Sequence, residues 1–314
     1  MATSISKCCV CDRLIDGEGF TLGGRHYCAT HYRNVTRERR AAAQPIIFSI
    51  IGTVVFVALV AWLADLIKPS IAGEGLVALG VVLAIVPAFL WLVAFYYQDR
   101  LEHEPKGYVL GVLLLGAILA QGVGQPLIRD VFKVQSWLGA DLLTTLLGMI
   151  FVVGFVQEFL KYAVVRYTVY RSVEFDERVD GIIYSAAAGL GYATMLNLQY
   201  VVSSGGVDLG VGALRVAVAA LAQASFSGVV GYFLGRAKFE AMGVFWLPIG
   251  LTLAAVLNGI VNFALGEVTT LGGVVFNPWY GLVLAAVVAG ATFVILFTVI
   301  RRLNAATLAS AASA

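Results

Sequence analysis

Long apolar segments limit the possible folds of this sequence more than any other feature. Eight of them occur, at residues 45–67, 75–97, 107–128, 138–163, 180–203, 209–235, 243–265 and 279–300. Each is long enough for the roughly 20 residues that span a hydrocarbon core, and each must be helical because lipid offers no hydrogen bonds to the backbone. Since 60% of all residues are hydrophobic and only 13% are charged, we predict an all-α polytopic membrane protein with about eight transmembrane helices.

The distribution of lysine and arginine predicts how these helices are oriented. If the N-terminus is inside, the inner loops and the C-terminus contain Arg100, Lys106, Arg166, Arg171, Arg178, Arg236, Lys238, Arg301 and Arg302. The outer loops contain only Lys68, Arg129 and Lys133, and Arg215 lies within a helix near its outer end. Because basic residues favour the cytoplasmic side, we expect both termini in the cytoplasm. The first residues show no cleavable signal pattern, so we expect the first transmembrane helix to direct insertion.

The four cysteines of the chain all lie close to its N-terminus. Cys8, Cys11, Cys28 and His31 follow the spacing Cys-x2-Cys-x16-Cys-x2-His, which suits a tetrahedral structural zinc site. Turn residues between the two pairs predict a small hairpin, and metal binding would supply folding energy that so short a module lacks. The stretch resembles half of a LIM domain or a small zinc ribbon.

The choice of ligands leaves two alternatives open, because Cys9 can replace Cys8 and His26 can replace His31. Another interpretation is a reduced cytosolic tail with reactive thiols. Four protein ligands leave no open position on the metal, so we interpret the zinc as structural and not catalytic. The chain then divides into a zinc module at 1–33, a basic linker at 34–44, a transmembrane domain at 45–304 and a short C-terminal tail at 305–314.

Two charged residues inside an apolar segment mark a candidate site. Glu158 and Lys161 lie in segment 138–163, where an ionisable residue costs about 2.5–3.5 kcal/mol on insertion scales and points to function by default. They are three positions apart, so on a helix they share a face and can partly neutralise each other. The alternative is a structural ion pair at the helix end, with Lys161 reaching toward the membrane interface.

Neutral amides extend into three further apolar segments. They are Asn197, Gln199, Gln223, Asn258 and Asn262. Each amide must find a hydrogen-bond partner, because burying it without one is unfavourable. Hydrogen bonding between helices, at about 0.6 kcal/mol per bond, is the simplest interpretation of any one of them, and nearby glycine, alanine and serine residues would let the helices approach closely.

Taken in order, these stretches resemble the PrsW family of intramembrane metalloproteases, distant relatives of the CAAX-processing proteases, over about residues 98–264. Residues 99–106 resemble the acidic Glu-Pro loop of the family, and Gln157-Glu158-x-x-Lys161 falls where the family has Glu-Glu-x-x-Lys. Residues 189–200 fall on a Gly-Leu-Gly-Phe-Ala…Glu-Asn…Tyr stretch. Gln223 and Asn258 fall where the family has a histidine.

The resemblance implies metal-binding and catalytic roles for four positions at which this sequence departs from the family. The expected acids and histidines are replaced by Gln157, Leu196, Gln223 and Asn258. A hydrolytic zinc needs about three strong ligands and an open position for water, and neutral amides are poor zinc ligands. Glu158 and Lys161 remain as catalytic candidates, with Glu158 as the only general base.

Two functions of different class follow. In the first, the protein is a non-catalytic relative, a scaffold or accessory subunit that contacts other membrane proteins through the former substrate groove. In the second, it is an active protease with a rearranged site centred on Glu158. We favour the first, because groups that act as a unit in catalysis fail together. A transporter is the weakest alternative, since no internal repeat is visible.

The remaining predictions concern partners and location. A net charge of +2 is evidence against a nucleic-acid partner. The apolar segments require a lipid bilayer. The resemblance implies a prokaryotic cytoplasmic (inner) membrane, with the zinc module facing the cytoplasm.

Overall fold

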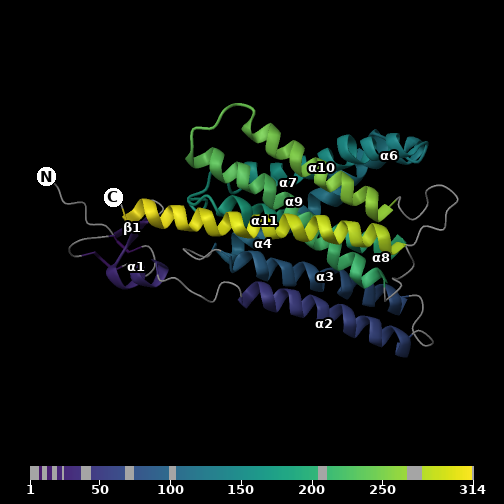
Figure 1. Cartoon of the computed structure of the whole chain (residues 1–314), viewed down its shortest axis with the longest axis horizontal. Coiled ribbons are helices and arrows are strands. Elements are labelled where there is room, and N and C mark those ends of the chain that lie inside the picture. Colours follow the sequence, from purple (N-terminus) through teal and green to yellow (C-terminus); the bar gives the residue numbers. More distant parts are fainter. Residues whose placement is uncertain are drawn as a thin grey trace.

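The structure of the chain, a computed structural model, consists mainly of helices (Figure 1). It describes residues 7–8, 13–15, 20–22, 25–36, 44–67, 74–98, 104–203, 211–266 and 278–312. The α-helices of this part are α1 (Ala29–Thr36), α2 (Gln44–Ile67), α3 (Glu74–Tyr96), α4 (Lys106–Leu119), α5 (Val134–Trp137), α6 (Leu142–Gly148), α7 (Phe155–Tyr167), α8 (Asp180–Ser203), α9 (Val211–Phe239), α10 (Trp246–Gly266) and α11 (Pro278–Ala312). π-Helical segments occur as η2 (Ala120–Gly124), η3 (Leu127–Val131) and η4 (Met149–Gly154).

The predicted all-α membrane fold is confirmed. Five described helical stretches are long and apolar enough to cross a membrane: Lys106–Trp137, Leu142–Tyr167, Gly212–Phe239, Trp246–Gly266 and Trp279–Thr307. Shorter apolar helices lie at Gln44–Val60 and Gly80–Tyr96. Each of the eight predicted segments overlaps a helix, but the number of membrane crossings stays a prediction.

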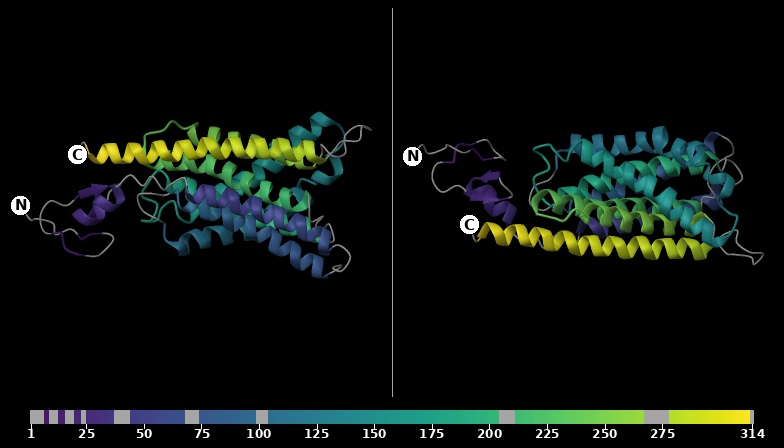
Figure 2. Two further views of the ribbon diagram at one scale, coloured as in Figure 1. Left: turned by 60° about the horizontal axis from the view of Figure 1, so that its bottom comes forward. Right: turned by 90° about the horizontal axis from the view of Figure 1, so that it is seen from above.

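The surface of the bundle suits a lipid environment. The long helices run side by side along one axis (Figures 1 and 2). Large apolar side chains are exposed on the outer helices, among them Phe48 and Val54 of α2 and Val287 and Ile295 of α11. In water such a surface would favour aggregation, whereas in a bilayer it faces acyl chains.

Helix α8 occupies the centre of the bundle and packs against α3, α4 and α9. Its residues are buried without interruption from Asp180 to Ala193. The run of alanine and glycine in this stretch makes α8 less apolar than the helices at the periphery. The physical reason is that α8 is surrounded by other helices and not by lipid, so it needs small residues for close packing more than apolar bulk.

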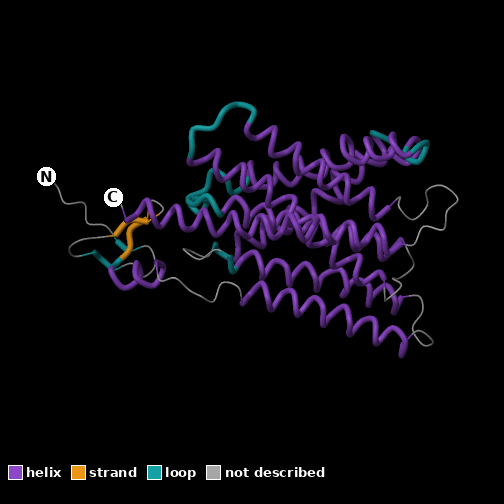
Figure 3. The backbone as a smooth tube through the Cα atoms, in the orientation of Figure 1, coloured by secondary structure: helices purple, strands orange, loops and turns teal. Residues whose placement is uncertain are grey.

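The N-terminal module contains the hairpin that the sequence predicts. Strands β1 (Phe20–Leu22) and β2 (Arg25–Tyr27) pair antiparallel, with Phe20 opposite Tyr27 (Figure 3). Helix α1 follows directly, and β1 contacts α11. Helix α11 is longer than predicted: it continues past residue 300 to Ala312, so most of the stretch 305–314 is helix.

The N-terminal module and the end of α11 lie at the same end of the bundle. The N-terminal module and the C-terminal end of α11 are neighbours in all three ribbon views (Figures 1 and 2). The basic connections between α7 and α8 and between α9 and α10 lie at this end as well. This arrangement is the one that an N-in, C-in orientation requires, and the assignment of this end to the cytoplasm stays a prediction.

Helices α8 and α9 touch through their backbones at Gly181 and Gly231. A Cβ atom at Gly231 would overlap the carbonyl group of Gly181, and a Cβ atom at Gly181 would overlap that of Gly231. No side chain fits at either position without moving the two helices apart. The central helix therefore keeps its position only while both residues are glycine.

Gly231→Ala is expected to destabilise the protein by about 1–3 kcal/mol, because it overpacks this contact. A matched control is Gly290→Ala on α11, where a new Cβ atom meets nothing within 4 Å and alanine raises helix propensity. Thermal unfolding of detergent-solubilised protein, followed by tryptophan fluorescence, should show a lower transition temperature for the first variant only. Equal transition temperatures for both variants would contradict the packing argument.

Candidate functional site

Three helices bring the polar residues of the bundle together. Helix α7 carries Glu158 and Lys161, α9 carries Gln223 and α10 carries Asn258. Close contact between α10 and the start of α7 depends on glycine, because a Cβ atom at Gly154, the η4 residue directly before α7, would overlap the carbonyl group of Ala255. The helix axes are thereby close enough for short amide side chains to reach across.

The four side chains form a closed ring of hydrogen bonds, which we call the polar ring: Glu158, Lys161, Gln223 and Asn258. The Lys161 ammonium donates to Glu158 Oε1 at 2.6 Å and to Gln223 Oε1 at 2.5 Å. The Gln223 amide donates to Asn258 Oδ1 at 3.2 Å, and the Asn258 amide donates to Glu158 Oε1 at 2.6 Å. The ring joins all three helices through polar atoms.

Two further amides extend the polar ring. Gln157 Oε1 accepts from the Gln223 amide at 3.2 Å and from the Asn262 amide at 3.4 Å. Asn262 also donates to Asn258 Oδ1 at 2.5 Å. Amides can form such a network without external help, because each carries both donors and an acceptor.

The predicted pairing of Glu158 and Lys161 is confirmed, but the pair lies in the interior. Their side chains are only 0% and 1% exposed, so Lys161 does not reach the membrane interface. Its ammonium lies 5.5 Å from the ring centroid of Tyr192 on α8. Within the described part of the chain, Glu158 Oε2 is buried without a hydrogen-bond partner. The helix-end alternative is therefore wrong in its placement of Lys161.

Leu196 is the one candidate that is neither in the polar ring nor hydrogen-bonded to it. It is half-buried and packs on the apolar cluster of Ala120, Leu160 and Tyr192. It nevertheless lines the same cavity as Gln157. The structure thus places all four replaced positions in one region, three as hydrogen-bonded amides and one as an apolar wall.

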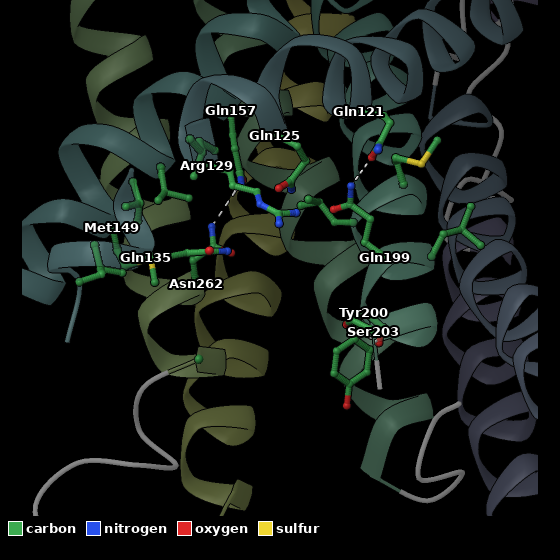
Figure 4. Close-up of a pocket in the computed structure, with 18 of the residues that line it drawn as sticks. Gln121, Gln125, Arg129, Gln135, Met149, Gln157, Gln199, Tyr200, Ser203 and Asn262 are labelled. Atoms are coloured by element: carbon green, nitrogen blue, oxygen red, sulfur yellow. Dashed lines mark hydrogen bonds between the residues drawn. The ribbon is translucent and has the colours of Figure 1, made fainter. Parts of the chain in front are cut away.

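A large cavity opens beside the polar ring. Its volume is about 1150 Å³, and Gln157 and Asn262 form part of its wall. Figure 4 shows the labelled Gln121, Gln125 and Gln199 side chains in the same space, with a hydrogen bond between the Gln199 amide and Gln121 Oε1. Gln199 is among the amides that the sequence places in an apolar segment as candidates, whereas Gln121 and Gln125 join the site only through the tertiary structure.

The N-terminal module brings three of its predicted ligands together. The ligand atoms of Cys8, Cys28 and His31 all lie within 4.8 Å of one another. His31 Nδ1 lies 3.2 Å from Cys28 Sγ and 3.5 Å from Cys8 Sγ. His26 is paired opposite Thr21 in the hairpin and is not part of this cluster. Cys9 and Cys11 lie outside the described residues.

Glu104, two residues before α4, is anchored to the central helix. Glu104 is buried and accepts a hydrogen bond from the hydroxyl of Tyr184 on α8. The hydroxyl of Tyr96 on α3 donates to the backbone oxygen of Glu104 at 3.0 Å. These contacts give Glu104 a structural role at the end of the bundle that holds the N-terminal module.

Comparison with known proteins identifies related sequences. A family model described as PrsW family intramembrane metalloprotease matches residues 104–300. Two curated relatives named Protease PrsW, from Halalkalibacterium halodurans and Bacillus subtilis, are each 31% identical over 176 residues; these cover 56% and 55% of this chain and 78% and 77% of the relatives. A third, from Geobacillus kaustophilus, is 32% identical over 155 residues, which are 49% of this chain and 65% of the relative. No solved structure matches.

Lys161→Met is expected to destabilise the protein by about 3–5 kcal/mol, because it leaves the Glu158 carboxylate buried without its cation. The double variant Glu158→Gln/Lys161→Met should recover much of this loss, since no charge then stays uncompensated. Lys106→Met, which changes an exposed lysine at the start of α4, serves as the control. Thermal unfolding in detergent measures all three, and a Lys161→Met protein as stable as the control would refute the role of the ion pair.

Proposed function

Since the chain belongs to the PrsW family of intramembrane metalloproteases, we propose that it is a non-catalytic member that binds membrane proteins as a scaffold or accessory subunit. The observation that carries the proposal is the closed polar ring. Side chains at the positions of the expected metal ligands are bonded to one another through amide groups. Amides that bond to one another in this way have no need of a metal ion.

The residues present do not fit the metal that the family implies. A catalytic zinc needs about three strong ligands, and within the described residues only the N-terminal cysteines and His31 form a group of three or more potential ligands. Glu158 bonds to Lys161 and Asn258, and Gln223 bonds to both of these residues. An ammonium group beside the carboxylate would also repel a cation.

An active protease is the second candidate, and two observations favour it. The curated relatives are named as proteases. Glu158 also keeps one buried carboxylate oxygen without a hydrogen-bond partner in the described part of the chain, and such a group is unfavourable unless it has a use. In this alternative Glu158 is the general base of a rearranged site.

The N-terminal module is proposed to hold one structural zinc through Cys8, Cys28 and His31, with Cys11 as the fourth ligand. Support comes from the convergence of the three described side chains and from the hairpin that precedes Cys28. The module then faces the cytoplasm of a prokaryotic cell, where cysteines stay reduced and serve metals. Its contact with α11 suggests that it also caps the end of the bundle.

The zinc content of the purified full chain tests where metal binds. We expect about one zinc per wild-type chain and none in the variant Cys28→Ser/His31→Ala, because loss of two ligands opens the module. Elemental analysis of both proteins in detergent measures this. One zinc retained by the variant would place metal in the membrane domain and favour the protease.

Catalysis is tested with Glu158→Gln, which removes the only candidate base. Proteolysis would create new N-termini in membrane proteins of the host cell. We expect mass spectrometry of N-terminal peptides to find the same N-termini in cells with the wild-type protein and in cells with the variant. Mild detergent extraction and native electrophoresis should show the wild-type protein migrating with other proteins. A cleavage product that is lost in the variant would overturn the non-catalytic proposal, and migration as a free monomer would count against an accessory subunit.

A further inference from the structure

The cavity beside the polar ring has an unusual charge. Its described lining contains two arginines, Arg129 and Arg215, and no aspartate, glutamate or lysine. Neither arginine forms an ion pair within the described part of the chain, and the Arg215 guanidinium stacks over the ring of Tyr200 at 4.3 Å. Among the described residues, these two positive charges therefore line the cavity without a compensating acid.

The backbone around the cavity is also irregular. Its lining includes Gln121 from η2, Arg129 from η3 and Met149 from η4, so each of the described π-helical segments contributes to the wall. A π-helical segment forms a less favourable backbone than an α-helix and often occurs at functional sites. Three such segments contribute to the wall of this one cavity, which favours a functional role for it.

The polar groups of the wall are mainly amides. Five glutamines line the cavity: Gln121, Gln125, Gln135, Gln157 and Gln199. Each glutamine offers two donors and an acceptor, which complements a ligand that itself has both donors and acceptors. A peptide backbone has both, whereas the phosphate and ester groups of a phospholipid mainly accept. The volume of about 1150 Å³ is above the range of small-molecule pockets.

Part of the cavity lies away from the N-terminal module. Its lining includes residues of η3, of α5 and of the C-terminal ends of α8 and α10, and these elements lie at the opposite end of the bundle in Figure 1. With the N-terminal module in the cytoplasm, a ligand would enter from the outer side of the membrane.

From these observations we propose that the cavity binds an extended polypeptide segment that carries acidic side chains, with its peptide groups on the glutamine amides and its carboxylates on Arg129 and Arg215. This inference rests on the proposed function, because it names the chemistry of the partner that the non-catalytic protein would hold. Charge complementarity with the two arginines makes binding selective for acidic side chains. The glutamine amides bond to the peptide backbone and therefore place no requirement on the other side chains.

The test uses the full chain in nanodiscs of zwitterionic phosphatidylcholine and a pool of short fluorescein-labelled peptides with two fixed glutamates. A matched pool carries glutamine at the same positions. Fluorescence anisotropy should show about tenfold tighter binding of the glutamate pool, which corresponds to ~1.4 kcal/mol. Added salt should reduce the difference in affinity between the two pools, because Arg129 is exposed and Arg215 is partly exposed.

Arg129→Gln/Arg215→Gln should abolish the preference for glutamate and leave binding of the glutamine pool almost unchanged, so a loss of both would indicate misfolding. In that case the inference is tested by the single variant Arg129→Gln, which changes an exposed side chain and should weaken the preference for glutamate. The salt dependence of the wild-type protein is the second test. Arg171→Gln is the control, since this exposed arginine lies in the α7–α8 connection at the other end of the bundle.

Equal binding of the two pools would overturn the inference. Displacement of the glutamate pool by short-chain phosphatidylglycerol would assign the cavity to a lipid headgroup, and displacement by inorganic phosphate would assign it to a free anion; both results overturn the peptide assignment. Mass spectrometry of the bound peptides tests the non-catalytic function separately from the binding inference. Cleaved glutamate peptides would end the non-catalytic function and leave the binding inference standing.

Discussion

The surrounding structure depends on the buried ion pair of Lys161 and Glu158, whose charges must be compensated by neighbouring polar groups. Isolated charges in a protein interior cost several kcal/mol each, and their mutual attraction offsets this only when the remaining polar atoms are also satisfied. Gln223 and Asn258 meet part of this requirement, since Gln223 accepts from Lys161 at 2.5 Å and Asn258 donates to Glu158 Oε1 at 2.6 Å, while Glu158 Oε2 has no hydrogen-bond partner among the described residues. The two amides can do so only because small residues such as Gly154 let α7 approach α10.

The chemistry of amides explains how a metalloprotease framework can keep its shape with different residues in the site. Carboxylates and imidazoles at these positions would gather negative charge and lone pairs, which a cation must balance. Gln157, Gln223, Asn258 and Asn262 are neutral and bond to one another. The same helix positions are then held together by hydrogen bonds, and the only charges left are those of the ion pair, which sum to zero.

The chain separates two tasks in space. Potential metal ligands gather in the N-terminal module, whose cysteines and histidine lie beside a short hairpin. The membrane domain instead has a cavity lined by amides and by two arginines that form no ion pair with another described residue. If the module holds the proposed structural metal and the cavity binds the proposed acidic peptide, these two tasks would lie toward opposite ends of the bundle.

Features that depend on local spacing were determined by the sequence alone. Apolar length placed the helices, the Cys-x2-His spacing placed Cys28 beside His31, and a separation of three residues paired Glu158 with Lys161. Other features depend on how helices pack, which no local pattern contains. Lys161 bonds to Gln223 across 62 residues of sequence, and a lysine near a helix end reaches either the interface or the interior according to its neighbours. Tertiary structure alone decided that it points inward and that distant glutamines and arginines share one cavity.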